Sequence, residues 1–249
     1  MKNEEFFIGW ESKPDPGIRN FLRSRTVLLM VLALILALML AFFQKTIGNG
    51  VFEFGNLRDF SGVLIQSPTP MLVADEPTEG ERIFYLVAPF KYGFPKEEAA
   101  KYHLHQVKLQ GTLIHNELEA MIEVAADSVE SEGQVNSAPL EEGGAEELVT
   151  LRGEIVDSKC HLGVMNPGST KTHRACAIHC IAGGIPPLLV VRSTNGMTQH
   201  LLVGPEGEPI NEAILDFVAE PVEVSGQRSM VGDRSVLKID PQTIKRLDE

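Results

Sequence analysis

The longest uninterrupted hydrophobic run lies near the amino terminus. Residues 26–43 (TVLLMVLALILALMLAFF) form eighteen consecutive positions without a charge. At about 1.5 Å of rise per residue, a helix of this length extends roughly 27 Å, which is close to the hydrocarbon thickness of a bilayer. A buried helix of a globular protein seldom lacks a polar face over such a length. The run therefore predicts a transmembrane helix.

Basic residues flank this run unequally. Those before it include Lys13, Arg19, Arg23 and Arg25, whereas only Lys45 follows shortly after it. Positively charged flanks stay in the cytoplasm. Residues 1–25 are therefore expected to form a cytoplasmic segment, and everything after the run is expected on the extracytoplasmic (periplasmic) side. No small-x-small cleavage pattern follows, so the run is expected to remain as a single-pass signal anchor.

Beyond the anchor, hydrophobic and polar residues alternate in short stretches that predict β-strands. The first group lies within residues 52–126, at 59–66, 70–75, 82–88, 105–114 and 118–124. The second group lies within residues 148–247, at 149–157, 187–192, 199–203, 221–227 and 235–240. Each group has a predicted helix between its third and fourth strands, PKEEAAKY (95–102) in the first and PINEAILDFVA (209–219) in the second.

The two groups also resemble each other in sequence. The segment HQVKLQGTLIHNELEAMIEV (105–124) aligns without a gap with EPVEVSGQRSMVGDRSVLKI (220–239), and two upstream blocks align in the same order at nearly the same offset. This pattern predicts an internal duplication. Three strands, a helix and two strands in this order resemble the oligonucleotide/oligosaccharide-binding (OB) barrel, which implies a fold and no substrate. The predicted fold is mainly β, with an N-terminal transmembrane helix followed by two tandem OB-like barrels.

Two segments interrupt this correspondence. Residues 127–147 carry seven acidic residues and no basic one, which predicts a flexible acidic linker. The second group also has about 26 more residues between its first two strands, because FSGVLI (60–65) aligns with LRGEIV (151–156) at a smaller offset than the blocks that follow. This insertion, at 158–184, occupies the position of a binding loop in OB barrels.

All three cysteines of the chain lie in the insertion, where TKTHRACAIHCIAGG (170–184) predicts a helix. At 100° per residue, His173, Cys176 and Cys180 fall on one face of this helix, and Cys160 lies in a loop that can fold back toward it. Convergent cysteine and histidine side chains are typical of a metal site. The predicted ligands are Cys160, His173, Cys176 and Cys180, with His179 and Met165 as second choices.

Several identities are open for the bound group. Three thiolates and an imidazole suit zinc, two thiolates with an imidazole and a thioether suit copper, and an exported location favours copper slightly. The pattern Cys-x-x-Cys-His is missing, which argues against c-type haem. In CAIH (176–179), the cysteine and the histidine have one of the two Cys/His spacings of a Rieske site. Cys160 and His161 are adjacent and do not have the other spacing, so an iron–sulfur cluster is not expected. The alternative without a metal is a structural disulfide from Cys160 to Cys176 or Cys180, which leaves one cysteine unpaired.

The charge of the chain and the lack of catalytic patterns exclude several classes of function. A formal net charge of −12 argues against nucleic acid as a partner. The insertion itself is basic through Lys159, Lys171 and Arg174, which favours an anionic ligand or simply a solvated loop. No Ser/His/Asp arrangement, paired carboxylates or glycine-rich phosphate loop predicts substrate turnover, so the chain is not expected to act as a free-standing enzyme.

The sequence therefore predicts a membrane-anchored, metal-binding and redox-associated protein. It would serve as an electron-transfer or metal-delivery accessory to a membrane oxidoreductase, with a membrane or envelope protein as its partner. The alternative is a non-catalytic envelope assembly or scaffold protein, which uses OB-like surfaces for interactions and a disulfide for rigidity.

Overall fold

The structure is a computed structural model that describes residues 16–43, 50–137, 139–140, 142–194 and 196–247. The chain divides into two compact units, Met1–Thr46 and Ile47–Glu249. The first fifteen residues of the expected cytoplasmic segment lie outside the described residues.

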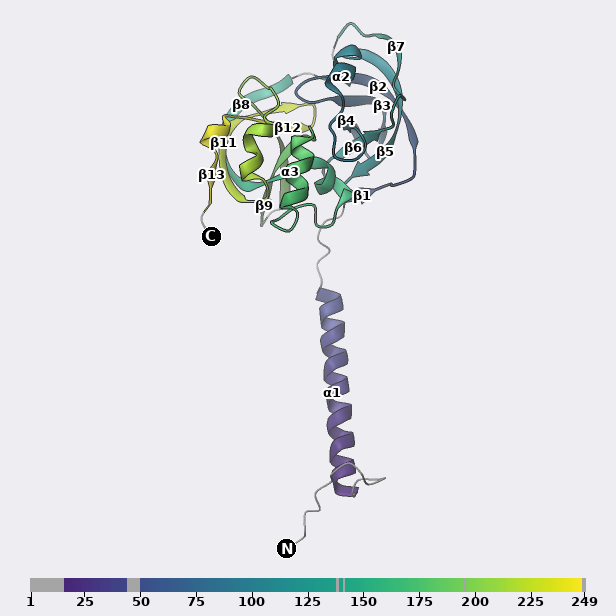
Figure 1. Cartoon of the computed structure of the whole chain (residues 1–249), viewed down its shortest axis with the longest axis vertical. Helices are drawn as coiled ribbons and strands as arrows, with labels where there is room; N and C mark the ends of the chain where they lie inside the picture. The colour runs from purple at the N-terminus through teal and green to yellow at the C-terminus, as the bar shows by residue number, and fades with distance from the viewer. Residues whose placement is uncertain (1–15, 44–49, 138, 141, 195, 248–249) are drawn as a thin grey trace. The chain divides into compact units, whose positions relative to one another are not determined.

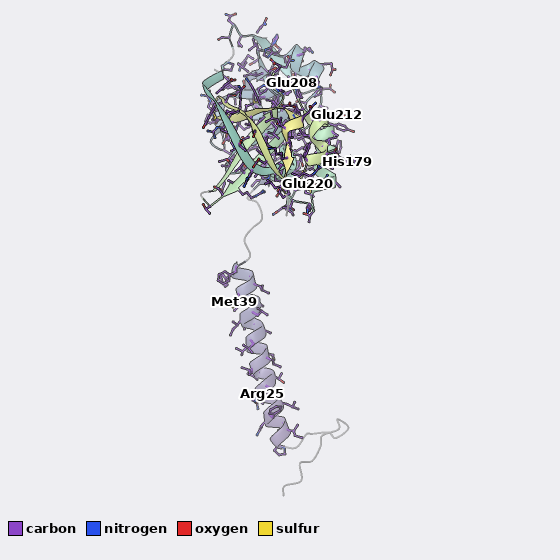
Figure 2. The ribbon with its side chains drawn as sticks, turned by 90° about the vertical axis from the view of Figure 1, so that its left-hand side faces the viewer. Arg25, Met39, His179, Glu208, Glu212 and Glu220 are labelled. Atoms are coloured by element: carbon purple, nitrogen blue, oxygen red, sulfur yellow. The ribbon has the colours of Figure 1, made fainter. Side chains whose placement is uncertain are left out.

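The described part of the first unit is a single helix, α1 (Pro16–Phe43), which has no buried residue. Figure 2 shows its side chains, Arg25 and Met39 among them, projecting away from the helix axis. The helix is long and apolar enough to cross a membrane. It contains the predicted run 26–43 and extends it toward the amino terminus, because proline is well tolerated in the first helical turn and no helix-breaking residue follows Gly17.

The second unit begins with a closed five-stranded barrel (Figure 1). Its strands are β2 (Arg58–Ile65), β3 (Met71–Thr78), β4 (Glu81–Val87), β5 (His105–His115) and β6 (Ala120–Val124). The antiparallel pairs are β2–β3, β3–β4, β5–β6 and β2–β5, while β4 and β6 pair in parallel. Helix α2 (Lys96–Lys101) connects β4 to β5, and the short β1 (Val51–Phe52) pairs with β5.

A second closed barrel follows with the same order of pairing. Its strands are β8 (Glu142–Asp157), β9 (Pro187–Ser193), β10 (Gly196–Val203), β11 (Pro221–Val231) and β12 (Arg234–Ile239). The antiparallel pairs are β8–β9, β9–β10, β11–β12 and β8–β11, while β10 and β12 pair in parallel. After β12, a 3-10 turn η3 (Pro241–Thr243) leads to the short β13 (Lys245–Arg246), which pairs with β11. The ten strands predicted from alternation are thus present, with shifted ends.

The helix predicted within the second barrel has a different form. The chain from Asn211 to Phe217 is a 3-10 helix, η2, and the α-helix expected from Pro209 onward does not form. The start of η2 is tied to the insertion, because the Asn211 side-chain amide donates to the carbonyls of Ile181 (2.8 Å) and Ile185 (2.9 Å).

The segment expected to be a flexible linker contains strand structure. Strand β7 (Glu130–Gln134) pairs with β5, and β8 already begins at Glu142, where it pairs with β11. The acidic side chains fit this arrangement because two of them meet lysines on the neighbouring strands. Glu132 lies 2.5 Å from Lys108, and Glu146 lies 3.0 Å from Lys238. An acidic composition therefore did not distinguish a linker from solvent-facing strands.

Alternate residues of the barrel strands face different hydrophobic cores. In β4, Phe84 lies in the core of the first barrel, whereas Tyr85 lies in a core that both barrels share. In β10, Leu202 lies in the core of the second barrel, whereas Leu201 lies in the shared core. Strands that are apolar on both faces, such as β4, are typical of sheets covered on both sides. The two barrels therefore pack as one compact unit, while the sequence predicts two domains joined by a linker.

A buried polar cluster crosses the shared core. Arg234, on the second barrel, is 2% exposed. Its guanidinium lies 2.5 Å from the Glu81 carboxylate and donates to the Ile83 carbonyl at 2.5 Å, and it lies 3.9 Å from Glu119. The Tyr85 hydroxyl donates to Glu119 at 3.5 Å. Because these partners all belong to the first barrel, the cluster joins the two barrels.

Stability should depend on pH through this cluster. Burial raises the pKa of Glu119 from 4.5 to about 7, although the charge of Arg234 opposes the shift. The folded protein then binds a proton more tightly than the unfolded chain, so the free energy of unfolding falls as the pH rises from 4.5 to about 7. The loss from this group is about 3 kcal/mol. Urea unfolding across this pH range measures it, and Glu119→Gln should show a smaller decline than the wild type. Parallel profiles for the two proteins would show that another group titrates.

Candidate metal centre

The insertion between β8 and β9 folds as two short helical pieces. The first, η1 (Cys160–Val164), is a short turn that follows β8. The second, α3 (Arg174–Ala182), leads back to β9, and Figure 1 labels both of these elements. Helix α3 ends because Gly184 adopts a left-handed backbone conformation, with φ of +96°, and its amide donates to the Ile181 carbonyl at 2.9 Å. The two pieces bring the start and the end of the insertion together.

The three cysteine sulfurs converge at this point. The Sγ atoms of Cys160, Cys176 and Cys180 all lie within 4.8 Å of one another. An ion bound tetrahedrally at about 2.3 Å from each sulfur separates the sulfurs by about 3.8 Å, so only a small contraction is needed. Cys160 and Cys180 are 3% and 2% exposed, whereas Cys176 is half-buried. All three are free thiols. This group can bind a metal ion.

A lysine from the other barrel reaches the same sulfurs. Lys91 lies in the connection between β4 and α2, and its ammonium donates to Cys176 Sγ at 2.7 Å and to Cys180 Sγ at 3.7 Å. The contact with Cys176 raises the pKa of Lys91, which keeps this side chain positively charged. The sulfur cluster therefore has a fixed cation beside it, and the first barrel completes the site.

The two buried thiols differ in acidity. Cys160 donates a hydrogen bond to Cys180, and this contact lowers the pKa of Cys180 to about 7, with a further contribution from the positive charge of Lys91. The same hydrogen bond and the burial of Cys160 hold its pKa well above its usual range. The metal-free site therefore favours a thiolate at Cys180 and a neutral thiol at Cys160. Metal binding to all three sulfurs must displace the Cys160 proton, since the thiolate is the ligand.

A second group of donors includes Cys160. Asp157, Cys160 and His173 each offer one donor atom, these atoms lie within 4.8 Å of one another, and all three residues are buried. The Asp157 carboxylate accepts from the Cys160 backbone amide at 2.8 Å and lies 3.1 Å from His173 Nε2. The Asp157 carboxylate thus contacts the start of both helical pieces of the insertion, η1 and α3. This group can also bind a metal ion.

The structure places the predicted ligands in two different donor groups. One group contains Cys160, Cys176 and Cys180. The donor atom of His173 lies close to Cys160 but belongs to no group with the other two cysteines. His179 belongs to neither group, and it is exposed at the surface of α3, where Figure 2 labels it. On a helix of 3.6 residues per turn, His179 is rotated by 100° from its neighbour Cys180, which turns it toward solvent. Met165 is 48% exposed.

Two further residues of this site, Asp157 and Lys91, were not indicated by the sequence pattern. Asp157 is the last residue of β8, and a fully buried carboxylate at that point is visible only in the fold. Lys91 lies 85 residues from Cys176, on the other barrel. A lysine within the run APFKYGF (88–94) carries no recognisable signal in the sequence.

The basic residues of the insertion are engaged within the protein. Lys159 is 2% exposed, donates to the carbonyls of Ala88 (2.9 Å) and Phe90 (2.7 Å), and lies 2.5 Å from the Glu123 carboxylate. These contacts fix the connection that carries Lys91. Arg174 forms an ion pair with Glu220. Two of the three basic residues of the insertion, Lys159 and Arg174, thus hold the barrels and the insertion together.

Removing the Lys91 ammonium should change the acidity of the cluster. In Lys91→Met, the pKa of Cys180 is expected to rise by roughly half a unit, because an adjacent positive charge is lost. A pH titration of thiolate ultraviolet absorbance on the metal-free protein measures this. Lys96→Met, on the exposed start of α2, serves as the control and should titrate like the wild type. Superimposable curves for Lys91→Met and the wild type would contradict the assigned contact.

Comparison with protein-family models, with curated proteins and with solved structures finds no match to this chain.

Proposed function

We propose that this protein is a membrane-anchored metal-binding protein whose centre is the sulfur cluster of Cys160, Cys176 and Cys180. The observation that carries the proposal is the convergence of these sulfurs, which are the only three in cysteine residues of the chain and which lie up to twenty residues apart. Thiolates select soft or borderline ions such as Cu(I) and zinc. Copper is slightly preferred because the expected compartment is extracytoplasmic.

The proposed location rests on features of the first unit. Helix α1 is long and apolar enough to span a membrane, and its basic residues lie at its amino-terminal side, which supports a cytoplasmic amino terminus. On this topology, the second unit is extracytoplasmic, or periplasmic, and is tethered to the membrane by a single pass.

The role proposed for the centre is metal delivery or electron transfer to a membrane oxidoreductase. Delivery is the better supported of the two, because transfer between proteins proceeds by exchange of one ligand at a time. Cys176 is half-buried while Cys160 and Cys180 are buried, so an acceptor protein can reach one sulfur of the cluster first. Lys91 lies against that same sulfur and can neutralise it when the metal leaves.

The barrels are proposed to be OB-like and related by duplication. The shared order of pairing, in which the third and fifth strands of each barrel are parallel, supports this proposal. So does the position of the insertion, which follows the first strand of the second barrel at Asp157. In this fold the loop after the first strand is a common place for binding.

The competing proposal is an envelope scaffold that is braced by a disulfide. It requires a bond between two of the three sulfurs, whereas the structure has all three as free thiols. It also gives no reason for an ammonium group at 2.7 Å from one of them.

Metal analysis of the full chain in detergent separates the two proposals. After anaerobic reconstitution with Cu(I) or zinc, the wild type should retain metal on gel filtration and Cys176→Ser should lose most of it. His179→Gln and Met165→Leu are controls that change exposed side chains and should bind like the wild type. Metal below about a tenth of an equivalent in the wild type, with a disulfide detected by mass, would support the scaffold.

A further inference from the structure

The donor groups of the insertion overlap at a single atom. The sulfur of Cys160 belongs both to the group with Cys176 and Cys180 and to the group with Asp157 and His173. The sequence predicts one site with four ligands, but His173 does not join the other two cysteines. A single ion therefore cannot use all of these donors in the arrangement that the structure shows.

The two groups differ in the ions that they suit. Three thiolates favour a soft ion such as Cu(I). A carboxylate, a thiolate and an imidazole favour a borderline divalent ion such as zinc, which binds all three donor types at about 2.0 to 2.3 Å. Asp157, Cys160 and His173 are buried, so an ion held by them is shielded from water.

Formal charges favour occupation of both groups together. The fully deprotonated donors are three thiolates and the Asp157 carboxylate, and Lys91 supplies one opposing positive charge. Buried charge is costly unless it is paired. One monovalent ion on the three sulfurs and one divalent ion in the second group bring the total to zero, whereas a single ion leaves negative charge uncompensated.

We propose that Asp157, Cys160 and His173 form a second metal position, which takes a divalent borderline ion and shares the Cys160 thiolate with the first position. The centre is then binuclear, with Cys160 as the bridging ligand. The shared sulfur couples the two positions. An ion in the buried second position holds the Cys160 thiolate in place as a ligand for the ion in the first position. This proposal rests on the proposed metal-binding function of the three cysteines.

Cadmium-113 NMR of the full chain in detergent tests the second position. Cd²⁺ binds sulfur, nitrogen and oxygen donors, and its chemical shift reports the number of thiolates. At saturation the wild type should take up two equivalents and show two resonances, one of a thiolate-only position and one of a mixed position. Because a single sulfur bridges the ions, each resonance should be split by the other cadmium nucleus.

Variants assign the two resonances. His173→Ala and Asp157→Asn should each remove the mixed resonance and leave the thiolate-only resonance in place. His200→Ala is the matched control, because His200 is as buried as His173 (both 4% exposed) and belongs to neither group. It should retain both resonances.

The possible results distinguish a failure of the second metal position from a failure of metal binding by the three cysteines. A single thiolate-only resonance at one equivalent, unchanged in His173→Ala, would overturn the second position and leave the proposed function standing. Two resonances without mutual splitting would overturn the shared sulfur. No cadmium uptake by the wild type would overturn the proposed function as well. The wild-type stoichiometry needs no variant, so the test holds even if Asp157→Asn fails to fold.

Discussion

Replacing Cys180 by serine should lower the affinity for Cu(I) or zinc by at least about 100-fold. Structural thiolate sites bind with about 10–16 kcal/mol from four ligands, so one ligand contributes about 3 kcal/mol or roughly 100-fold. A serine hydroxyl stays protonated at neutral pH and cannot replace the thiolate. Cys180 is also central to the cluster, because it accepts the hydrogen bond from Cys160 and contacts Lys91.

A competition titration against a chelator of known affinity measures this loss. Met165→Leu is the control within the same insertion, since Met165 is 48% exposed, and it should bind within about twofold of the wild type. Circular dichroism verifies that both variants are folded. An affinity for Cys180→Ser equal to that of the wild type would remove this sulfur from the centre.

Replacing Arg234 by methionine should be the most destabilising single change in the interface between the barrels. The substitution leaves the carboxylates of Glu81 and Glu119 without their cationic partner, and Glu119 is only 5% exposed. Breaking a buried ion pair in this way costs about 3–5 kcal/mol. For a protein of this size, that corresponds to a fall in Tm of about 10 °C.

Thermal unfolding of the full chain in detergent measures the effect. Arg152→Met is the matched control, because Arg152 also pairs with a glutamate, Glu223 at 2.9 Å, but its side chain is 72% exposed. A surface pair of this kind contributes about 0–1 kcal/mol. Equal changes in Tm for the two variants would contradict the assignment of Arg234 as a buried link between the barrels.

The barrels were predictable because each strand has a regular pattern of apolar residues. Alternation located the ten strands to within several residues, and glycine and proline marked the turns. The packing of the barrels against each other was also present in the sequence. The run IFYLV (83–87) is apolar at every position, which indicates burial on both faces. If the second face of this strand lay in water, a polar residue would be expected at position 85. Tyr85 is instead fully buried in the shared core.

The candidate metal centre was predictable only in part, because some of its residues lie far apart in the sequence. Helical periodicity placed Cys176 and Cys180 on one face, and the composition of the insertion singled out Cys160. Asp157 and Lys91 act through contacts that depend on how β8 ends and on how the two barrels meet. His173 was assigned to the cysteines by its helical angle, but it lies at the cap of α3, where the Asp157 carboxylate holds its ring.

X-ray absorption at the metal edge shows directly whether the three cysteine sulfurs bind the metal. The full chain in detergent is reconstituted anaerobically with one equivalent of Cu(I), and the first coordination shell is measured. Three sulfur neighbours at about 2.3 Å are expected in the wild type, and the smaller fraction of copper that Cys176→Ser retains should have two. A shell of nitrogen and oxygen atoms alone, unchanged in Cys176→Ser, would contradict a centre built on Cys160, Cys176 and Cys180.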